Sequence, residues 1–256
     1  MERAEYEFLV QKLNSQDDIE RLKTQHEYSE GLLYNVLSRK IVRNTLRDYY
    51  RVKRHENQLA QEWRRGKPIL RLARELDFPP VLLASFILQK VGYSKKAFRQ
   101  SLVNPDSEKN VRVKHELVEV NKADFIYSPW AFDLQTKNGQ EAEIKIGEWL
   151  DAHKINFLSQ DENKQLGFHF RTPDFLLENP LDVNGKKIHW IESKASFGDD
   201  REIKKDHKKQ LQPYTEHFGP GMVVYWYGFI DDIKLDDNII LASSEFFGKK
   251  AHKKQA

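Results

Sequence analysis

Three charged side chains interrupt the apolar runs of residues 171–196, and their types are those that bind a metal ion and activate water. The segment reads RTPDFLLENPLDVNGKKIHWIESKAS, with Asp174 in its first apolar run and Glu192 and Lys194 in its second. Charges at such positions are normally exposed unless a partner compensates them. Carboxylates are ligands that Mg²⁺ or Mn²⁺ prefers, and a lysine beside such an ion can orient a water and stabilise charge on a phosphate. Phosphodiester hydrolysis is the chemistry that uses all of these groups.

A β-hairpin is expected to bring these side chains together. Asn184-Gly185 joins the two apolar runs, and this dipeptide strongly favours a two-residue hairpin turn. Because side chains alternate between the two faces of a strand, Glu192 and Lys194 are predicted to share one face, about 6–7 Å apart.

The register of this hairpin decides whether Asp174 can join the other two residues. An uninterrupted ladder from the turn would place Asp174 opposite Ala195, one residue out of phase with Glu192. A β-bulge restores the phase, and Pro180 is the candidate position because proline cannot donate to the ladder.

Two carboxylates in one cluster need a compensating positive charge. At a separation of ~5 Å and an effective dielectric constant of ~20 they repel by roughly 3 kcal/mol, against a total stability of about 5–15 kcal/mol for a domain. Lys194 relieves part of this repulsion, and a divalent cation relieves more. The alternative is an edge-strand ion pair of Glu192 with Lys194 or Lys187 and no site. The Pro173-Asp174 pair ahead of Glu192 favours the site.

The residues from about 126 onward alternate between helix and strand patterns. A helix is predicted in EAEIKIGEWLDAHKI, and its apolar side contains Ile144, Ile146, Trp149 and Leu150. Strands are predicted in DFLLE, KKIHWIESKAS, GMVVYWYGFIDDI and NIILASS, with the amphipathic helix DDREIKKDHKKQLQPYTEHF between the second and the third. This order predicts an α/β fold with a mixed β-sheet flanked by helices.

The first ~125 residues are predicted to be entirely helical. Ser15 is the expected N-cap of the helix SQDDIERLKTQ. A long helix is expected over SEGLLYNVLSRKIVRNTLRDYYRVKRHENQLAQEW, ending near Gly66 and Pro68. Its apolar residues recur at close to a 3.6-residue period, at Leu33, Val36, Leu37, Val42 and Leu46.

Three shorter helices are predicted to follow in PILRLARELD, PVLLASFILQKVG and SKKAFRQSLVN. Their lengths and short connections are typical of a helix-turn-helix unit. A compact three-helix core has the same pattern, so contact with nucleic acid and a purely structural role both remain open. The second segment is apolar enough that we expect much of it to be buried.

Composition and charge restrict the class of protein. The 256 residues include no cysteine, which excludes disulfides, thiolate zinc sites and a cysteine nucleophile. Residues 39–99 hold 16 basic against 5 acidic side chains, whereas residues 126–256 hold 18 against 21. This asymmetry favours a polyanion-binding region joined to a region that needs carboxylates, although a solvated helical surface would show the same excess.

We therefore predict a helical, basic domain over residues 1–125, which binds nucleic acid or a partner, and a catalytic domain over 126–247. The basic tail 248–256 is predicted to be disordered, either simply solvated or acting as a nuclear-import patch. No apolar run approaches ~20 residues and no signal-peptide core is present. This predicts an intracellular protein, in the nucleus or cytoplasm, without a membrane association.

The motif residues resemble a known superfamily. Pro173-Asp174 followed by Glu192-Ser193-Lys194 resembles the signature of the PD-(D/E)XK nucleases. The resemblance implies a restriction-endonuclease-like or Holliday junction resolvase-like core, behind the helical N-terminal region.

A second element and a closer resemblance follow in the same half of the chain. Gln210 and Tyr214 resemble the Q-x-x-x-Y element of the RecB-like and resolvase-like branches. The segments TPDF, HWIESKASFGD and FGPGMVVYWYGFI resemble the TPD-motif family of the codanin-interacting nuclease, over most of residues 139–231.

The resemblance implies a role for each matching position. Asp174 and Glu192 would be metal ligands, with the Ser193 carbonyl as a third, and Lys194 would orient the attacking water. Glu143 would complete the metal site, with Glu141 as its competitor and an ordinary solvated acid as the alternative. Gln210 would steady the site or the scissile phosphate. His169 and His189 are expected to have structural roles. Tyr225 and Tyr227 are expected in a buried strand, with stacking on a base as the alternative. Tyr214 is expected in the core.

The predicted function is therefore metal-dependent nuclease activity with Mg²⁺ or Mn²⁺ as cofactor. DNA, including branched DNA, is favoured over RNA as substrate. The alternative is a non-catalytic scaffold or regulatory subunit that keeps the fold and binds a codanin-like protein partner. The sequence does not indicate an oligomeric state.

Overall fold

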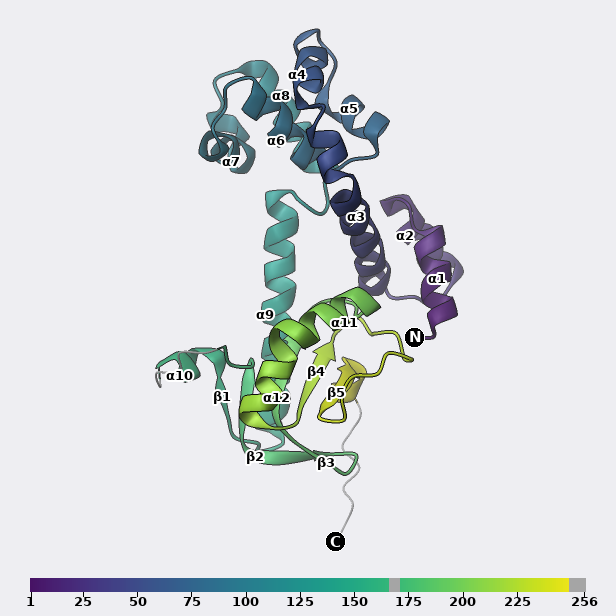
Figure 1. The fold of residues 1–256 in the computed structure, drawn as a ribbon, viewed down its shortest axis with the longest axis vertical. Helices are drawn as coiled ribbons and strands as arrows, with labels where there is room; N and C mark the ends of the chain where they lie inside the picture. The colour runs from purple at the N-terminus through teal and green to yellow at the C-terminus, as the bar shows by residue number, and fades with distance from the viewer. Residues whose placement is uncertain (166–170, 249–256) are drawn as a thin grey trace. The chain divides into compact units, whose positions relative to one another are not determined.

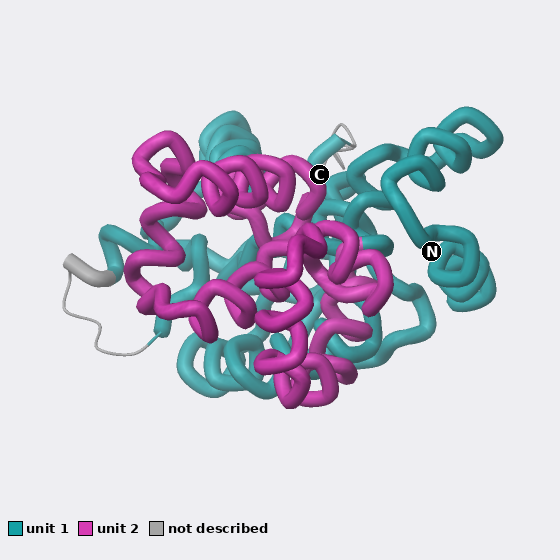
Figure 2. The backbone as a smooth tube through the Cα atoms, turned by 90° about the horizontal axis from the view of Figure 1, so that it is seen from above, with its two compact units in different colours: residues 1–37, 138–256 teal, residues 38–137 magenta. Residues whose placement is uncertain are grey.

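The structure is a computed structural model, and it describes residues 1–165 and 171–248. The chain forms two compact units (Figure 2), one from residues 1–37 together with 138–256 and the other from residues 38–137. This division reflects which parts of the chain pack against each other. The functional boundary near residue 125 stays a prediction.

The unit of residues 38–137 is helical. It contains most of α3 (Glu30–Lys53) and the start of α9 (Pro129–Ala152). Between them lie α4 (Glu56–Arg64), α5 (Ile69–Leu76), α6 (Pro80–Lys90), α7 (Lys95–Val103), the 3₁₀ turn η1 (Pro105–Ser107) and α8 (Val111–Ala123). The three short predicted helices are thus confirmed as α5, α6 and α7. Helix α6 contacts α4, α5, α7 and α8, and Leu83, Ile87 and Leu88 on it are fully buried. The predicted burial of this apolar helix is therefore also confirmed.

The long helix predicted over residues 29–63 is in fact two helices. Helix α3 (Glu30–Lys53) ends before a turn at Arg54-His55, and α4 begins at Glu56. Val52, at the end of α3, and Leu59, in α4, both enter one core. Of the apolar residues at the 3.6-residue period, Leu33, Val36 and Leu37 are buried, whereas Leu46 is 63% exposed.

The other unit is built on a five-stranded sheet (Figure 1). The strands follow chain order across the sheet: β1 (Phe157–Ser159), β2 (Phe175–Val183), β3 (Lys186–Lys194), β4 (Gly221–Tyr225) and β5 (Ile239–Ser243). Strands β1, β2 and β3 pair antiparallel, whereas β3, β4 and β5 pair parallel. The predicted mixed sheet is confirmed. Four strands were predicted, and the short β1 was missed. The predicted strand that begins at Gly221 ends at Tyr225, well before residue 233.

Helices pack on both faces of this sheet. On one face lies α9 (Pro129–Ala152), whose Ile146 and Leu150 share a core with Phe175 and Ile191. Ile144 was predicted to lie on the apolar side of this helix. That prediction is wrong, because the Ile144 side chain is 58% exposed. The residues that α9 buries follow an i, i+4 spacing through Ala142, Ile146 and Leu150, and position 144 lies on the other side of the helix.

On the opposite face lies a continuous helical segment. It consists of α11 (Asp200–Asp206), a π-helical turn (His207–Leu211) and α12 (Gln212–Phe218), and Figure 1 shows it lying across the sheet. Its Ile203 and Leu211 share a second core with Trp190 and Tyr225. Because strand side chains alternate, Glu192 and Lys194 face this helical segment together with Trp190.

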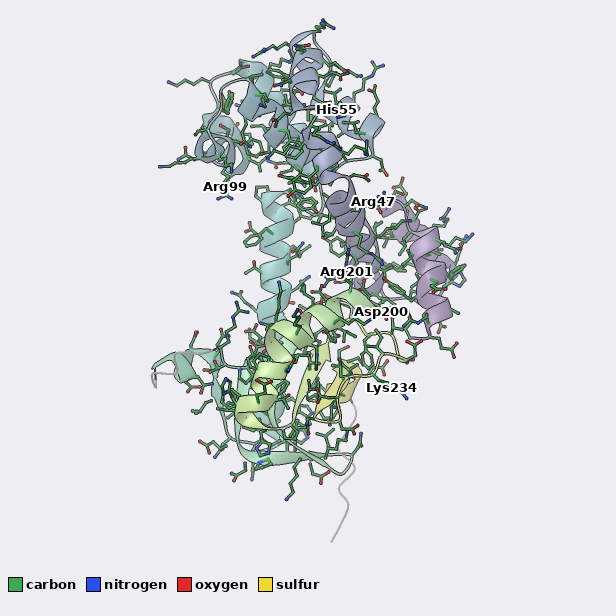
Figure 3. All side chains as sticks on the ribbon, viewed as in Figure 1. Arg47, His55, Arg99, Asp200, Arg201 and Lys234 are labelled. Atoms are coloured by element: carbon green, nitrogen blue, oxygen red, sulfur yellow. The ribbon has the colours of Figure 1, made fainter. Side chains whose placement is uncertain are left out.

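The N-terminal helices belong to the same unit as the sheet. They are α1 (Arg3–Lys12), α2 (Gln16–Gln25) and the first turns of α3. Ser15 is the N-cap of α2, as predicted, and its N–H donates to Asp18 at 2.9 Å. Arg3 of α1 forms ion pairs at 2.7 Å with Asp232 and with Asp200, the latter labelled in Figure 3 at the start of α11.

Two short helices complete the unit, α10 (Gln160–Gln165) and α13 (Glu245–Gly248). Within residues 1–165 and 171–248, no helix is both long and apolar enough to span a membrane. The predicted basic tail and His169 lie outside the described residues, apart from Gly248.

A close approach between β3 and β4 gives a stability prediction. Gly221 pairs with the fully buried Trp190, and a Cβ at Gly221 would lie 1.9 Å from the Trp190 ring. Gly221→Ala is therefore expected to destabilise the protein by about 3 kcal/mol in urea unfolding, since overpacked cores lose that much. The matched change Gly139→Ala, in α9 with open space around it, should stabilise the protein by about 0.5–1 kcal/mol. Equal effects of the two substitutions would contradict this packing.

Candidate active site

The hairpin turn has the predicted geometry. Val183 pairs with Lys186 across Asn184-Gly185, and both turn residues have positive φ angles, 54° and 83°. Positive φ at both positions is the requirement of a type I′ turn, which asparagine and glycine meet at low cost. The turn fixes the register of β3 against the last residues of β2.

A bulge in β2 restores the phase of the ladder. Leu181 pairs with Ile188, but Leu176 pairs with Trp190, so three additional residues lie on the β2 side. An odd number of extra residues moves each side chain beyond the bulge to the opposite face of the sheet. The interruption includes Pro180, as predicted, although it is two residues larger than the single-residue bulge expected. Continuing the register beyond Phe175 places Asp174 opposite Glu192.

Backbone N–H groups donate to both carboxylates. The Ser193 N–H donates to Asp174 Oδ2 at 2.7 Å, and the Asp174 N–H donates to Glu192 Oε2 at 3.3 Å. Glu192 is 3% exposed, so the Asp174 N–H and the Lys194 ammonium replace water as its donors. These contacts bring the two predicted acids into one buried cluster at the end of the β2–β3 pair.

Lys194 connects this cluster to the helical segment. Its ammonium donates to Glu192 Oε1 and to Gln210 Oε1, both at 2.7 Å. Gln210 lies in the π-helical turn between α11 and α12. The four residues predicted to be catalytic therefore lie in one hydrogen-bonded group.

Negative charge exceeds positive charge in this group. Burial and then the charge of Asp174 raise the pKa of Glu192 to about 8. Burial also raises the pKa of Asp174, although the Ser193 N–H and Lys194 oppose the increase. Burial lowers the pKa of Lys194, but the charge and hydrogen bond of Glu192 outweigh it and the pKa is raised. One ammonium thus does not neutralise the acids around it.

Glu143 is the nearer of the two competing glutamates. Partial burial and the negative charges of Asp174 and Asp161 raise its pKa, and Lys194 lowers it. Its side chain is otherwise on the exposed side of α9. Burial, and then the charge of Glu141, raise the pKa of Tyr227. The structure thus places Glu143 within electrostatic reach of Asp174, and its role as a ligand stays a prediction.

The remaining predicted residues lie around the site. The Ser193 hydroxyl accepts from Trp226 Nε1 at 3.0 Å, and the role of its carbonyl stays a prediction. Tyr214 is 1% exposed and packs edge-on against Trp190 at 5.5 Å, which confirms its place in the core. His189 contacts the Gly219 turn rather than the carboxylates.

One buried acid beside the site was missed by the sequence analysis. Asp206 is 5% exposed, and its Oδ2 accepts from the Tyr225 hydroxyl at 3.0 Å. Tyr225 is fully buried, so the prediction that it could stack on a base is wrong. Asp206 precedes Gln210 by four residues, and this helical spacing is the only signal in the sequence that pointed to it.

The oxygen atoms of this cluster are possible ligands of a metal ion. Among the residues that the structure describes, no three His, Cys, Asp or Glu side chains form a group ready to hold a metal. Mg²⁺ does not require such a cage, because it is usually bound by one or two carboxylates together with waters and substrate phosphates. The buried Glu192 and the adjacent, partly buried Asp174, both with raised pKa values, fit this mode of binding.

The fold and the site together define an α/β protein in which two carboxylates and a lysine at one end of the β2–β3 pair meet a glutamine of the helical segment. The family model described as "Protein of unknown function TPD sequence-motif" matches residues 109–246. The chain belongs to this TPD family.

Curated proteins are also similar to this chain in sequence. The chain is 34% identical over 172 residues to "CDAN1-interacting nuclease 1" of Bos taurus and of Homo sapiens, covering 64% of this chain and 61% of each relative. The Danio rerio protein of that name is 35% identical over 201 residues, which cover 73% of this chain and 64% of the relative. The chain thus spans about three-fifths of the length of these relatives. No solved structure matches.

Proposed function

We propose that this protein is a metal-dependent nuclease of the PD-(D/E)XK type, with a restriction-endonuclease-like core. The observation that carries the proposal is the convergence of Asp174 and Glu192 with Lys194, whose ammonium lies 2.7 Å from Glu192. The name of the curated relatives supports the same activity. Buried acids with an uncompensated negative charge would serve no purpose in a purely structural strand pair, because burial of such groups costs stability.

Each residue has a role that follows from its contacts. Asp174 and Glu192 would hold Mg²⁺ or Mn²⁺, with Glu143 and the Ser193 carbonyl as further ligands. When bound, the ion would supply a Lewis acid for the phosphate and a more acidic water. Lys194 would orient that water and stabilise negative charge on the phosphate.

Gln210 acts on this site through Lys194. Its Oε1 accepts from the ammonium at 2.7 Å, so it restricts where Lys194 can place its charge. Because Lys194 has a second acceptor on the helical segment, its ammonium is held at the boundary between the sheet and that segment.

Nucleic acid is the proposed substrate, with DNA favoured over RNA and branched DNA included. The basic excess of residues 39–99 suits a phosphate backbone. Helices α5, α6 and α7 would act as a helix-turn-helix-like unit. On α7, Lys95, Lys96 and Arg99 are exposed while Phe98 is buried, and Arg99 is labelled in Figure 3.

The second candidate function is binding of a codanin-like protein partner by a scaffold without catalysis. It is supported by the printed name of the relatives, which states an interaction with CDAN1. Calorimetric titration with Mg²⁺ or Mn²⁺ discriminates between the two: a scaffold has no reason to bind a cation, whereas a nuclease binds one.

A cleavage panel tests the nuclease proposal. Purified protein is incubated with single-stranded, double-stranded, flapped and branched substrates, in DNA and in RNA, with Mg²⁺, with Mn²⁺ or with a chelator. We expect cleavage of at least one substrate that requires the metal and stops with the chelator. Cleavage that is equal in metal and in chelator, or absent throughout while no cation binds, would contradict the proposal.

A further inference from the structure

Asp206 is a buried carboxylate that the proposed mechanism does not yet use. It lies at the end of α11 and is 5% exposed. The Tyr225 hydroxyl fixes one of its oxygens at 3.0 Å. Tyr225 is itself the register partner of Lys194 in the parallel β3–β4 pair, so the side chains of Lys194 and Tyr225 lie side by side on the face that α11 covers.

Ordinary structural roles do not account for this carboxylate. The N-terminus of α11 is capped by Asp199, which accepts from Arg201 and Glu202 N–H groups. Lys205 approaches the second oxygen of Asp206 only to 3.9 Å, and it is 46% exposed and bonded to Glu202 at 2.7 Å. A surface pair of this kind contributes little, and it does not require a buried acid held by a buried tyrosine.

The charge that faces Asp206 from the sheet is Lys194. The charge of Asp206 is among the influences that raise the pKa of Lys194, after those of Glu192, and Lys194 in turn opposes the increase that burial causes in the pKa of Asp206. Asp206 and Gln210 are four residues apart on the inner side of the helical segment. Lys194 therefore bonds Glu192 on its own strand and Gln210 on the helical segment. Asp206 lies on the same segment without an ion pair to Lys194 in this structure, and it acts on the ammonium through its charge.

If Glu192 also binds a divalent cation, its carboxylate attracts the Lys194 ammonium less strongly, because its negative charge is then shared between the two cations. We propose that Asp206, fixed by the Tyr225 hydroxyl, is a positioning residue whose charge attracts the Lys194 ammonium in addition to Glu192 and holds it in place when Glu192 binds a divalent cation. The second half of this statement rests on the proposed nuclease function. The first half concerns only the cation-free protein.

A double-mutant cycle tests the first half without any metal. Asp206→Asn keeps the shape of the side chain and an oxygen for Tyr225, but it removes the negative charge. Urea unfolding is measured for the unchanged protein, Asp206→Asn, Lys194→Met and the double variant. We expect Asp206→Asn to lower the urea midpoint more when Lys194 is present than when position 194 is methionine. Equal shifts in the two backgrounds would overturn the proposal, because a purely structural aspartate behaves the same in both.

Calorimetry with Mg²⁺ tests the second half. With Lys194 present, Asp206→Asn is expected to weaken Mg²⁺ binding about tenfold, because the ammonium then depends on Glu192 and competes with the ion. With methionine at position 194 the loss should be less than threefold. Asp206→Glu should recover part of the affinity, and Tyr225→Phe should reproduce part of the loss without changing charge. Equal losses in both backgrounds would overturn this half.

The two proposals fail in different ways. If the unchanged protein binds no Mg²⁺ and cleaves nothing, the nuclease function and the retention of Lys194 fall together, while a non-additive unfolding cycle would still support the pairing of Lys194 with Asp206. If the protein binds Mg²⁺ and cleaves but the cycle is additive, only the role of Asp206 is wrong.

Discussion

Replacing Lys194 with methionine is expected to lower metal-dependent cleavage about 10²–10³-fold, which is the usual cost of removing one group that stabilises developing charge. Methionine keeps the aliphatic length of the side chain and removes only the ammonium that now bonds Glu192 and Gln210 at 2.7 Å. Asp174 and Glu192 remain, so Mg²⁺ binding should persist. Single-turnover cleavage at saturating substrate measures the effect on the chemical step.

Lys187→Met is the matched control. Lys187 lies on the same strand and is exposed, so its loss should change the single-turnover rate by less than threefold. The assignment of Lys194 would be wrong if Lys194→Met, folded as judged by its urea midpoint, cleaved within threefold of the unchanged protein.

The stability of the cation-free protein is expected to fall as the pH rises from about 5 to 8. The pKa of Glu192 is about 8 in the folded protein against an ordinary value of 4.5. Between these values the folded state binds a proton that the unfolded state has lost, so the unfolded state becomes progressively favoured. The slope for one fully linked proton is about 1.4 kcal/mol per pH unit. Because Asp174 and Glu192 interact, they titrate together, and the bound proton is assigned to the pair and not to either residue alone.

Glu192→Gln should remove most of this slope, because glutamine cannot ionise. Glu178→Gln, an exposed change on β2, should preserve it. Added Mg²⁺ should stabilise the unchanged protein more at pH 8 than at pH 6, because metal binding requires deprotonated carboxylates. Urea unfolding at a series of pH values checks all three results. A flat profile for the unchanged protein would show that the carboxylates are not held as described.

Much of the site could be predicted because it depends on local rules. The Asn184-Gly185 turn fixes the register, and strand alternation then places Glu192 and Lys194 on one face. The need for a bulge near Pro180 followed from strand alternation alone, because an uninterrupted ladder would place Asp174 one residue out of phase with Glu192. The size of that bulge could not be predicted, since it depends on neighbouring strands: the Glu178 N–H donates to the Asn156 carbonyl at 3.0 Å, next to β1.

Other features were missed because tertiary packing decides them. Strand β1 has only three residues, too few to show an alternating pattern. Asp206 stands in an amphipathic helix rich in charged residues, where a solvated acid is the ordinary expectation. Only the fold brings the Tyr225 hydroxyl to it. The sequence pattern also does not show which apolar side chains of a helix remain exposed, as Leu46 and Ile144 illustrate.

The most direct measurement is an anomalous difference map from crystals of the protein grown with Mn²⁺. Mn²⁺ replaces Mg²⁺ at sites of carboxylate and carbonyl oxygens, and its anomalous signal locates the ion independently of any activity. We predict a peak about 2.0–2.3 Å from carboxylate oxygens of both Asp174 and Glu192, as expected for a hard divalent ion. A well-ordered map with no peak between these two side chains, at a saturating Mn²⁺ concentration, would contradict the central claim.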